Sequence, residues 1–239
     1  MVPPQGGYVS TKEERAAAFR AWLLRERTSK GMNQQQLALK IGVSAQTVSA
    51  WLTSTKSVVP THRVCGLIAR ALKVSARDLI ALTHGPTQKQ VSRIPHFLLM
   101  MRVLSALTKE KMSERFQIPV QTYVGYENGQ VIFSAEKYSD RQAMHLLARR
   151  MQMPKGFFIT LSLQKKPRGQ QAAPVFPTNT GEWLRWLCYE FNCQIGELAI
   201  LIGYSPSTVS GVKGGSYIPS DAFVEAVCDR FGPAPFDPA

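Results

Sequence analysis

The sequence is poor in acidic residues, in cysteine and in long apolar runs. It has 16 Asp and Glu residues against 29 Lys and Arg, and only 4 cysteines among 239 residues. The longest apolar run, residues 94–107, is too short to span a bilayer and is interrupted by His96 and Arg102. Residues 1–7 lack the charged and apolar regions of a signal peptide. We therefore expect a cytoplasmic protein without a membrane-spanning segment.

The cysteines and histidines do not follow a metal-binding pattern. Cys188 and Cys193 are too far apart for a Cys-x-x-Cys pair, and no second pair lies nearby. In a cytoplasmic chain we expect such thiols to stay reduced and to pack in or near the core. No phosphate-binding glycine loop and no paired set of catalytic carboxylates can be recognised. The sequence thus predicts no enzyme activity, no metal and no cofactor.

What the chain does have is an excess of positive charge. Its net charge is +13 and its isoelectric point is near 9.9, which favours a polyanionic partner. Residues 1–92 carry a net charge of +9, residues 93–178 carry +8 and residues 179–239 carry −4. Binding to duplex DNA depends largely on neutralising its phosphates. The first two regions are therefore expected to bind nucleic acid more strongly than the third.

A pattern of nineteen residues occurs three times without a gap. Apolar residues recur at its fifth and ninth positions, which lie on one face of a short helix. The tenth position is Gly42 or Gly203 in two copies, and Ser44 or Ser205 follows two residues later. Because glycine ends a helix and serine caps the next, each copy predicts two short helices joined by a tight turn. The copies are residues 33–51, NQQQLALKIGVSAQTVSAW; residues 108–126, TKEKMSERFQIPVQTYVGY; and residues 194–212, QIGELAILIGYSPSTVSGV.

All three copies resemble the lambda-repressor/Cro (XRE-type) helix-turn-helix family. The middle copy ends in Tyr126-Glu-Asn-Gly129, similar to the aliphatic-Glu-Asn-Gly ending of the family. The third has Gly215 four residues before Pro219, which is again the family spacing. The first departs from the pattern, with Thr53-Ser54 in place of Asn-Gly. The resemblance implies an all-α fold of three tandem small helical bundles joined by short linkers.

The resemblance also implies a division into domains. We expect a first helix-turn-helix DNA-binding domain over residues 1–92, a second over 93–162, a basic, proline-containing linker over 163–180 and an acidic helix-turn-helix-like domain over 181–239. Flanking helices are predicted to complete each bundle. They cover residues 12–27, 62–72 and 75–82 in the first domain, residues 97–107, 141–151 and 155–159 in the second, and residues 182–191 and 221–231 in the third.

In this family the residues that follow the serine cap face base edges in the major groove. Gln46 is the best candidate reader, because its amide can bond adenine at two points, while Ala45 or Thr47 can contact a thymine methyl group. Free amide groups at the start of the preceding helix favour a phosphate. In the first domain the resemblance thus assigns DNA contacts to Asn33, Gln34, Gln35, Ser44, Ala45, Gln46, Thr47, Ser49, Ala50 and Lys56.

The other two domains have weaker recognition surfaces. In the second, Val120 and Val124 stand where base readers are expected, and exposed apolar residues are more typical of a packing surface. The basic linker is either a solvated chain or an arm that enters the minor groove. The candidate DNA contacts are Lys109, Gln121 and Thr122 in the second domain, Lys165, Lys166 and Arg168 in the linker, and Ser207, Ser210 and Lys213 in the third domain.

The sequence thus predicts a sequence-specific, double-stranded-DNA-binding transcriptional regulator of bacterial, phage or mobile-element type, with repression favoured over activation. A homodimer through the third domain and a contact with RNA polymerase or another regulator are left open. One alternative is a DNA-binding protein for plasmid or mobile-element maintenance or transfer. Another is an adaptor or antirepressor that acts through protein contacts of the third domain.

Overall fold

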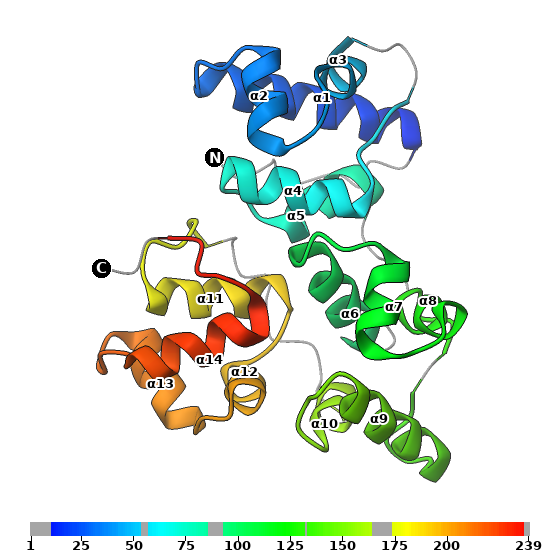
Figure 1. Ribbon diagram of the computed structural model, residues 1–239, viewed down its shortest axis with the longest axis vertical. Helices are drawn as coiled ribbons and strands as arrows, with labels where there is room; N and C mark the ends of the chain where they lie inside the picture. Colours follow the sequence, from blue (N-terminus) through cyan, green and yellow to red (C-terminus); the bar gives the residue numbers. More distant parts are fainter. Residues whose placement is uncertain (1–10, 54–56, 86–92, 132, 164–173, 237–239) are drawn as a thin grey trace. The chain divides into compact units, whose positions relative to one another are not determined.

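The computed structural model of the chain describes residues 11–53, 57–85, 93–131, 133–163 and 174–236. Regular structure in these ranges is entirely helical, with fourteen helices and no strand (Figure 1). The prediction of an all-α chain is therefore confirmed for the described residues. None of the described helices is long and apolar enough to cross a membrane. The chain divides into two compact units, which we call unit 1 (residues 1–88) and unit 2 (residues 89–239).

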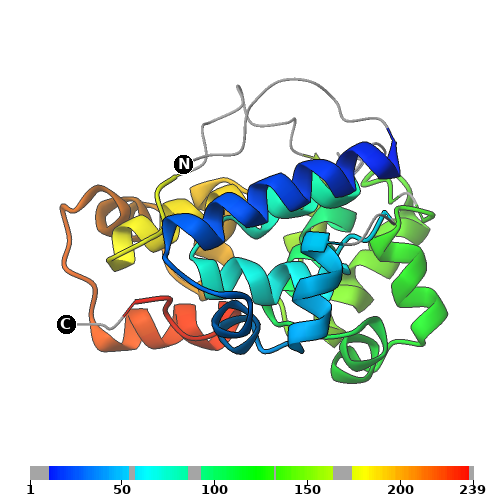
Figure 2. The ribbon, with the colours of Figure 1, turned by 90° about the horizontal axis from the view of Figure 1, so that it is seen from above.

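Unit 1 is a bundle of five helices around one apolar core. The long helix α1 packs against α5, and α4 packs against both α2 and α5 (Figures 1 and 2). Phe19, Leu37, Val48 and Ile68, from four of these helices, are completely buried. The five helices are α1 (Lys12–Ser29), α2 (Gln34–Ile41), α3 (Ala45–Thr53), α4 (His62–Leu72) and α5 (Ala76–His84).

The sequence explains where α1 begins. The backbone N–H of Glu14 donates to the Thr11 hydroxyl at 3.2 Å, and the Glu14 carboxylate accepts from the Thr11 N–H at 3.0 Å. This reciprocal capping box satisfies two of the N–H groups that a helix start leaves without partners. The predicted cap at Thr11 is confirmed, as are both ends of the helix predicted over residues 62–72.

Unit 2 contains nine helices in its described residues. They are α6 (Arg93–Leu104), α7 (Lys109–Phe116), α8 (Val120–Glu127), α9 (Tyr138–Arg150), α10 (Phe157–Leu163), α11 (Thr180–Glu190), α12 (Ile195–Ile202), α13 (Pro206–Gly214) and α14 (Asp221–Phe231). Helix α10 lies against both α6 and α12, and so joins the first half of the unit to the second.

Five phenylalanine rings form the centre of unit 2. Phe97 of α6 lies with its ring centroid 5.0 Å from that of Phe157 and 5.2 Å from that of Phe191. Phe158 and Phe231 extend the cluster, each 5.2 Å from a neighbouring ring. The rings come from α6, α10, α14 and the residue that follows α11. Aromatic rings at these separations contribute about 0.5–1.5 kcal/mol per pair beyond the area they bury.

The two domains predicted over residues 93–162 and 181–239 are thus packed together in one compact unit. Separate bundles on linkers were predicted instead, because this packing depends on contacts between distant residues, such as Phe97 and Phe191, which are 94 positions apart in sequence. Residues 164–173 of the predicted linker lie outside the described residues. Its last part packs on α11, where the Phe176 ring lies 5.1 Å from the Trp186 ring and Pro177 is buried.

Candidate nucleic-acid interface

Three pairs of short helices share one local geometry. In α2–α3, α7–α8 and α12–α13, a helix of eight residues is followed by a three-residue turn and a helix of eight or nine residues. Each first helix ends on a residue with left-handed backbone: Gly42 at φ 80°, Gln117 at φ 52° and Gly203 at φ 76°. The middle pair therefore makes the same turn without glycine, a conformation that other residues rarely adopt.

The second helices of the first and third pairs begin on the same cap. The backbone N–H of Thr47 donates to the Ser44 hydroxyl at 3.1 Å, and the two hydroxyl oxygens lie 2.8 Å apart. Ser205 and Thr208 repeat both distances at the start of α13. The cap of α8 differs, since Pro119 has no side-chain acceptor. The serine caps that the sequence predicted are confirmed in both copies.

The N-terminus of α2 is the predicted phosphate-binding end of the first pair. The Asn33 side chain accepts from the Gln36 N–H at 2.9 Å, and the Gln36 side chain accepts from the Asn33 N–H at 2.9 Å. Asn33 therefore caps the helix. The next two residues are Gln34, which is half-buried, and Gln35, which is exposed. The first turn contains no acidic residue, so a phosphate would meet no repulsion from this helix end.

Helix α3 has one face in the core and one face in solvent. Val48 is completely buried and Trp51 is 4% exposed, so these side chains anchor the helix to the bundle. The predicted base-contacting residues lie on the rest of its surface. Ala45 and Gln46 are exposed together with the cap residue Ser44, and Thr47, Ser49 and Ala50 are half-buried.

An arginine on the preceding long helix reaches the C-terminal end of each second helix. Arg20 Nε donates to the Trp51 carbonyl oxygen at 3.3 Å, and Arg185 Nη2 donates to the Lys213 carbonyl oxygen at 2.7 Å. In the middle pair, Arg102 forms two hydrogen bonds of 2.6 and 2.7 Å with the buried carboxylate of Glu127. A cation is favourable here because the C-terminal carbonyl groups carry partial negative charge.

In the middle pair, Lys109 is held by the end of α8. Its ammonium lies 3.7 Å from a Glu127 carboxylate oxygen and 3.4 Å from the side-chain oxygen of Asn128. The predicted readers Gln121 and Thr122 are exposed on α8. Tyr123, the next residue of α8, is buried. Burial raises the pKa of Tyr123 well above its usual value, so its hydroxyl stays protonated. This hydroxyl donates to the Leu98 carbonyl oxygen at 3.2 Å.

In the third pair, a tyrosine ring covers part of the second helix. A Cβ atom placed on Gly211 would lie 2.2 Å from a ring carbon of Tyr217, so only glycine permits this close approach. Ser207 and Ser210 are exposed and Lys213 is half-buried. The ring thus occupies the position that a side chain at residue 211 would take on this face.

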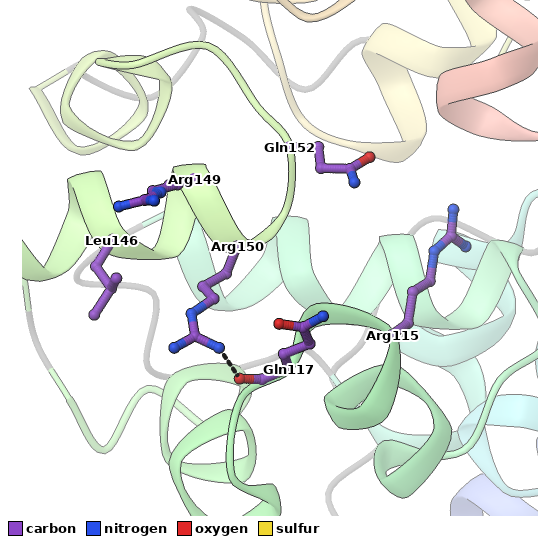
Figure 3. A pocket seen from close by; sticks show the side chains of 6 residues that line it. All are labelled: Arg115, Gln117, Leu146, Arg149, Arg150 and Gln152. Carbon is purple, nitrogen blue, oxygen red and sulfur yellow. Dashed lines mark hydrogen bonds between the residues drawn. The ribbon is translucent and has the colours of Figure 1, made fainter.

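Four predicted contacts cannot be placed. Lys56, Lys165, Lys166 and Arg168 lie outside the described residues. In contrast, three arginines that were not among the predicted DNA contacts, Arg115, Arg149 and Arg150, line a hollow in unit 2 (Figure 3). The adjacent arginines at the end of the predicted helix over residues 141–151 were the available signal for this hollow.

Comparison with known protein families agrees with the geometry of unit 1. Residues 23–79 match the Helix-turn-helix family, of the XRE type. The matched segment runs from the middle of α1 into α5 and includes the whole of α2 and α3. No curated protein and no solved structure matches the chain. A helix-turn-helix domain of this type is typical of DNA-binding transcription regulators, and the match covers about a quarter of the chain.

Proposed function

We propose that this protein is a sequence-specific regulator of transcription that binds double-stranded DNA with α3 in the major groove. One observation carries the proposal: the family match over residues 23–79 coincides with a helix whose polar face, centred on Gln46, is presented to solvent. The opposite face of α3 is anchored in the core by Val48 and Trp51. A reader on a rigid helix has a defined position relative to the base edges.

The chemistry of this face suits base recognition. The Gln46 amide can donate to and accept from adenine, and Ala45 presents a methyl group that suits thymine. Unit 1 has 12 basic and 4 acidic residues, a net charge of +8 that favours the phosphate backbone. Phosphate contacts hold the domain on the duplex, and the contacts of α3 select the sequence.

We further propose that α7–α8 and α12–α13 are two more copies of the same motif. The shared helix lengths, left-handed turns and arginine contacts support this interpretation. The copies differ in use. Gln121 and Thr122 give α8 a polar face for a second DNA contact, whereas Tyr217 covers part of α13 and residues 179–239 carry a net charge of −4.

The surface beside α13 favours a second role, in which this end of the chain contacts another protein. Ile218 is 96% exposed and Tyr217 is 57% exposed, and both lie within four residues of the end of α13. Exposed apolar side chains near a helix face are typical of protein contacts. A second copy of the chain, RNA polymerase or another regulator would be the partner.

We propose repression as the mode of action in a bacterial, phage or mobile-element setting, and a cytoplasmic location. A helix-turn-helix chain bound to an operator excludes polymerase from the same DNA without needing any further contact. The exposed polar faces on α3 and α8 suit binding, and we assign no catalytic role to them.

Genome-wide footprinting of DNA bound by the full chain tests the proposal most directly. We expect a recurring duplex motif near promoters, and loss of the protein should raise transcription from them. The separate fragment 1–88 should then bind the motif tightly, and the separate fragment 89–239 should bind it weakly. Binding to all duplexes with equal affinity, or tighter specific binding by fragment 89–239, would contradict the assignment of α3 as the main reader.

A further inference from the structure

Unit 2 contains a basic pocket at the end of α7 and the end of α9. Its volume is about 410 Å³, and Arg115, Gln117, Leu146, Arg149, Arg150 and Gln152 line it (Figure 3). Leu146 is the one apolar residue of this set. The lining therefore offers hydrogen-bond donors and positive charge, but little surface for an apolar ligand.

The positive charge of the basic pocket is not balanced within the described part of the chain. No described carboxylate forms an ion pair with Arg115, Arg149 or Arg150. The neighbouring carboxylate of Glu114 is instead 2.9 Å from the Lys111 ammonium. The lining of the basic pocket therefore carries three positive charges that no described carboxylate pairs with.

A fourth arginine adds to this positive field. Arg230 of α14 donates to the backbone carbonyl oxygen of Gln152 at 3.0 Å. Burial and then repulsion from Arg115 lower the pKa of Arg230, while the neighbouring carboxylate of Asp229 opposes this. An anion in the basic pocket would relieve this repulsion between α7 and α14.

Arg150 is held in place before any ligand arrives. Arg150 Nη1 donates to the Gln117 carbonyl oxygen at 2.6 Å, and Figure 3 shows this bond across the pocket. The Arg115 guanidinium carbon lies 6.0 Å from the ring centroid of Phe116. Arg149 is exposed. A site that is formed in advance loses less conformational entropy when its ligand binds.

We propose that the basic pocket binds phosphate, preferably as a diphosphate or a longer phosphate chain. The planar fork of arginine matches phosphate oxygens with two parallel hydrogen bonds, and several arginines suit an anion of multiple charge. The side-chain amides of Gln117 and Gln152 supply neutral donors at the rim. The volume exceeds the needs of a single phosphate group and lies within the usual range of about 300–1,000 Å³ for ligand sites.

The phosphate could come from a free ligand or from the backbone of bound DNA, and the chemistry of the site is the same for both. Isothermal titration of the full chain with sodium pyrophosphate, at constant ionic strength set by sodium chloride, tests the chemistry without DNA. We expect saturable binding, at least about tenfold weaker in Arg149→Gln, since a hydrogen bond to a charged group contributes about 1.5–3 kcal/mol. Arg141→Gln, an exposed arginine of the same helix outside the pocket, should bind like the wild type.

The side chain of Arg149 makes no hydrogen bond or ion pair within the described residues, so its substitution should leave folding intact, which circular dichroism can confirm. Absence of saturable pyrophosphate binding, or equal binding by Arg149→Gln and wild type, would overturn the proposal. The salt dependence of DNA binding separates the two sources. A smaller salt slope in Arg149→Gln indicates a DNA phosphate, whereas an unchanged slope with lost pyrophosphate binding indicates a free ligand. The titration needs no DNA, so pyrophosphate binding can be absent while the proposed regulator function holds. Pyrophosphate binding can equally be present if the proposed regulator function is wrong.

Discussion

The guanidinium of Arg93, at the start of α6, lies 2.6 Å from the carboxylate of Glu197 in α12. Both side chains are buried, and the same guanidinium donates to the Asn192 carbonyl oxygen at 3.1 Å through Nε. Glu197 also caps its own helix by accepting from the Gln194 N–H at 2.7 Å. This ion pair connects residues 104 positions apart and fixes the first helix of unit 2 against its second half.

Removing one partner of this pair should destabilise unit 2 strongly. We expect Arg93→Met to lower the free energy of unfolding by about 3–5 kcal/mol, because it leaves the Glu197 carboxylate buried without a counter-ion. The double variant Arg93→Met/Glu197→Gln should recover much of the loss while keeping the α12 cap. Denaturant titration followed by circular dichroism measures both.

The exposed pair Lys111–Glu114 is the matched control for this experiment. Its side chains are 66% and 64% exposed, so Lys111→Met should cost less than about 1 kcal/mol. If the losses from Arg93→Met and Glu197→Gln simply add in the double variant, the two residues are not coupled as the structure indicates.

Gln46→Ala should impair sequence recognition without impairing general DNA binding. We expect a loss of about 1–3 kcal/mol at the cognate site and almost none on random duplexes, since base contacts specify and phosphate contacts position. Electrophoretic mobility shifts on both duplexes give the two values. Gln142→Ala, an exposed glutamine of α9, is the control and should change neither. Equal losses on both duplexes would show that Gln46 does not read bases.

The left-handed turn residue of the middle pair predicts a stabilising substitution. Gln117→Gly should raise the stability of unit 2 by about 1 kcal/mol, because glycine adopts φ 52° without a Cβ penalty. The reverse change, Gly42→Ala, should lower the stability of unit 1 by a similar amount. A Cβ on Gly42 would meet no atom within 4 Å, so this loss would come from the backbone alone. Thermal unfolding of the full-length variants tests both signs, and a stability loss in Gln117→Gly would contradict them.

Unit 1 should lose stability as the pH falls below the ordinary pKa of histidine. Burial, together with repulsion from Arg15, lowers the pKa of His84 from its usual 6.5, although the Pro60 carbonyl 2.9 Å away opposes this. The folded state therefore binds a proton less readily than the unfolded state. The stability is present above pH 6.5 and is lost as the pH falls through this value towards the lower folded pKa.

Hydrogen exchange of backbone amides in residues 62–85 at pH 7.5 and pH 5, corrected for intrinsic exchange rates, measures this effect. His84→Gln, whose amide can still donate to Pro60, should reduce the difference in protection between the two pH values. An unchanged difference would assign the pH dependence to other groups.

The local features of unit 1 could be predicted from the sequence because they depend on near neighbours. The cap at Thr11, the left-handed Gly42 and the Ser44 cap each involve residues within four positions of one another. The start of α6 was predicted too late, at Phe97 instead of Arg93. Pro95 lies in the first turn of α6, where proline is tolerated because its missing N–H has no partner in any case.

The parts that the sequence did not reveal depend on distant contacts. The basic pocket needs the end of α7 and the end of α9, which are more than 30 residues apart, and a repeat pattern contains no information on how they meet. The same holds for Lys109, which was predicted as a DNA contact. Its ammonium is held beside Glu127 because the start of α7 meets the end of α8.

The shared core of unit 2 has a geometric consequence for any long target. Because α8 and α13 belong to one compact body, the surfaces that they contact must lie at one fixed spacing and orientation. If the partner protein at α13 is itself bound to the same duplex, adding about five base pairs between its site and the site of α8 would rotate one site to the opposite side of the DNA, since a turn takes about 10–10.5 base pairs. A chain with a flexible joint could adjust to this rotation. A body held together by five phenylalanine rings would instead bind only at one spacing.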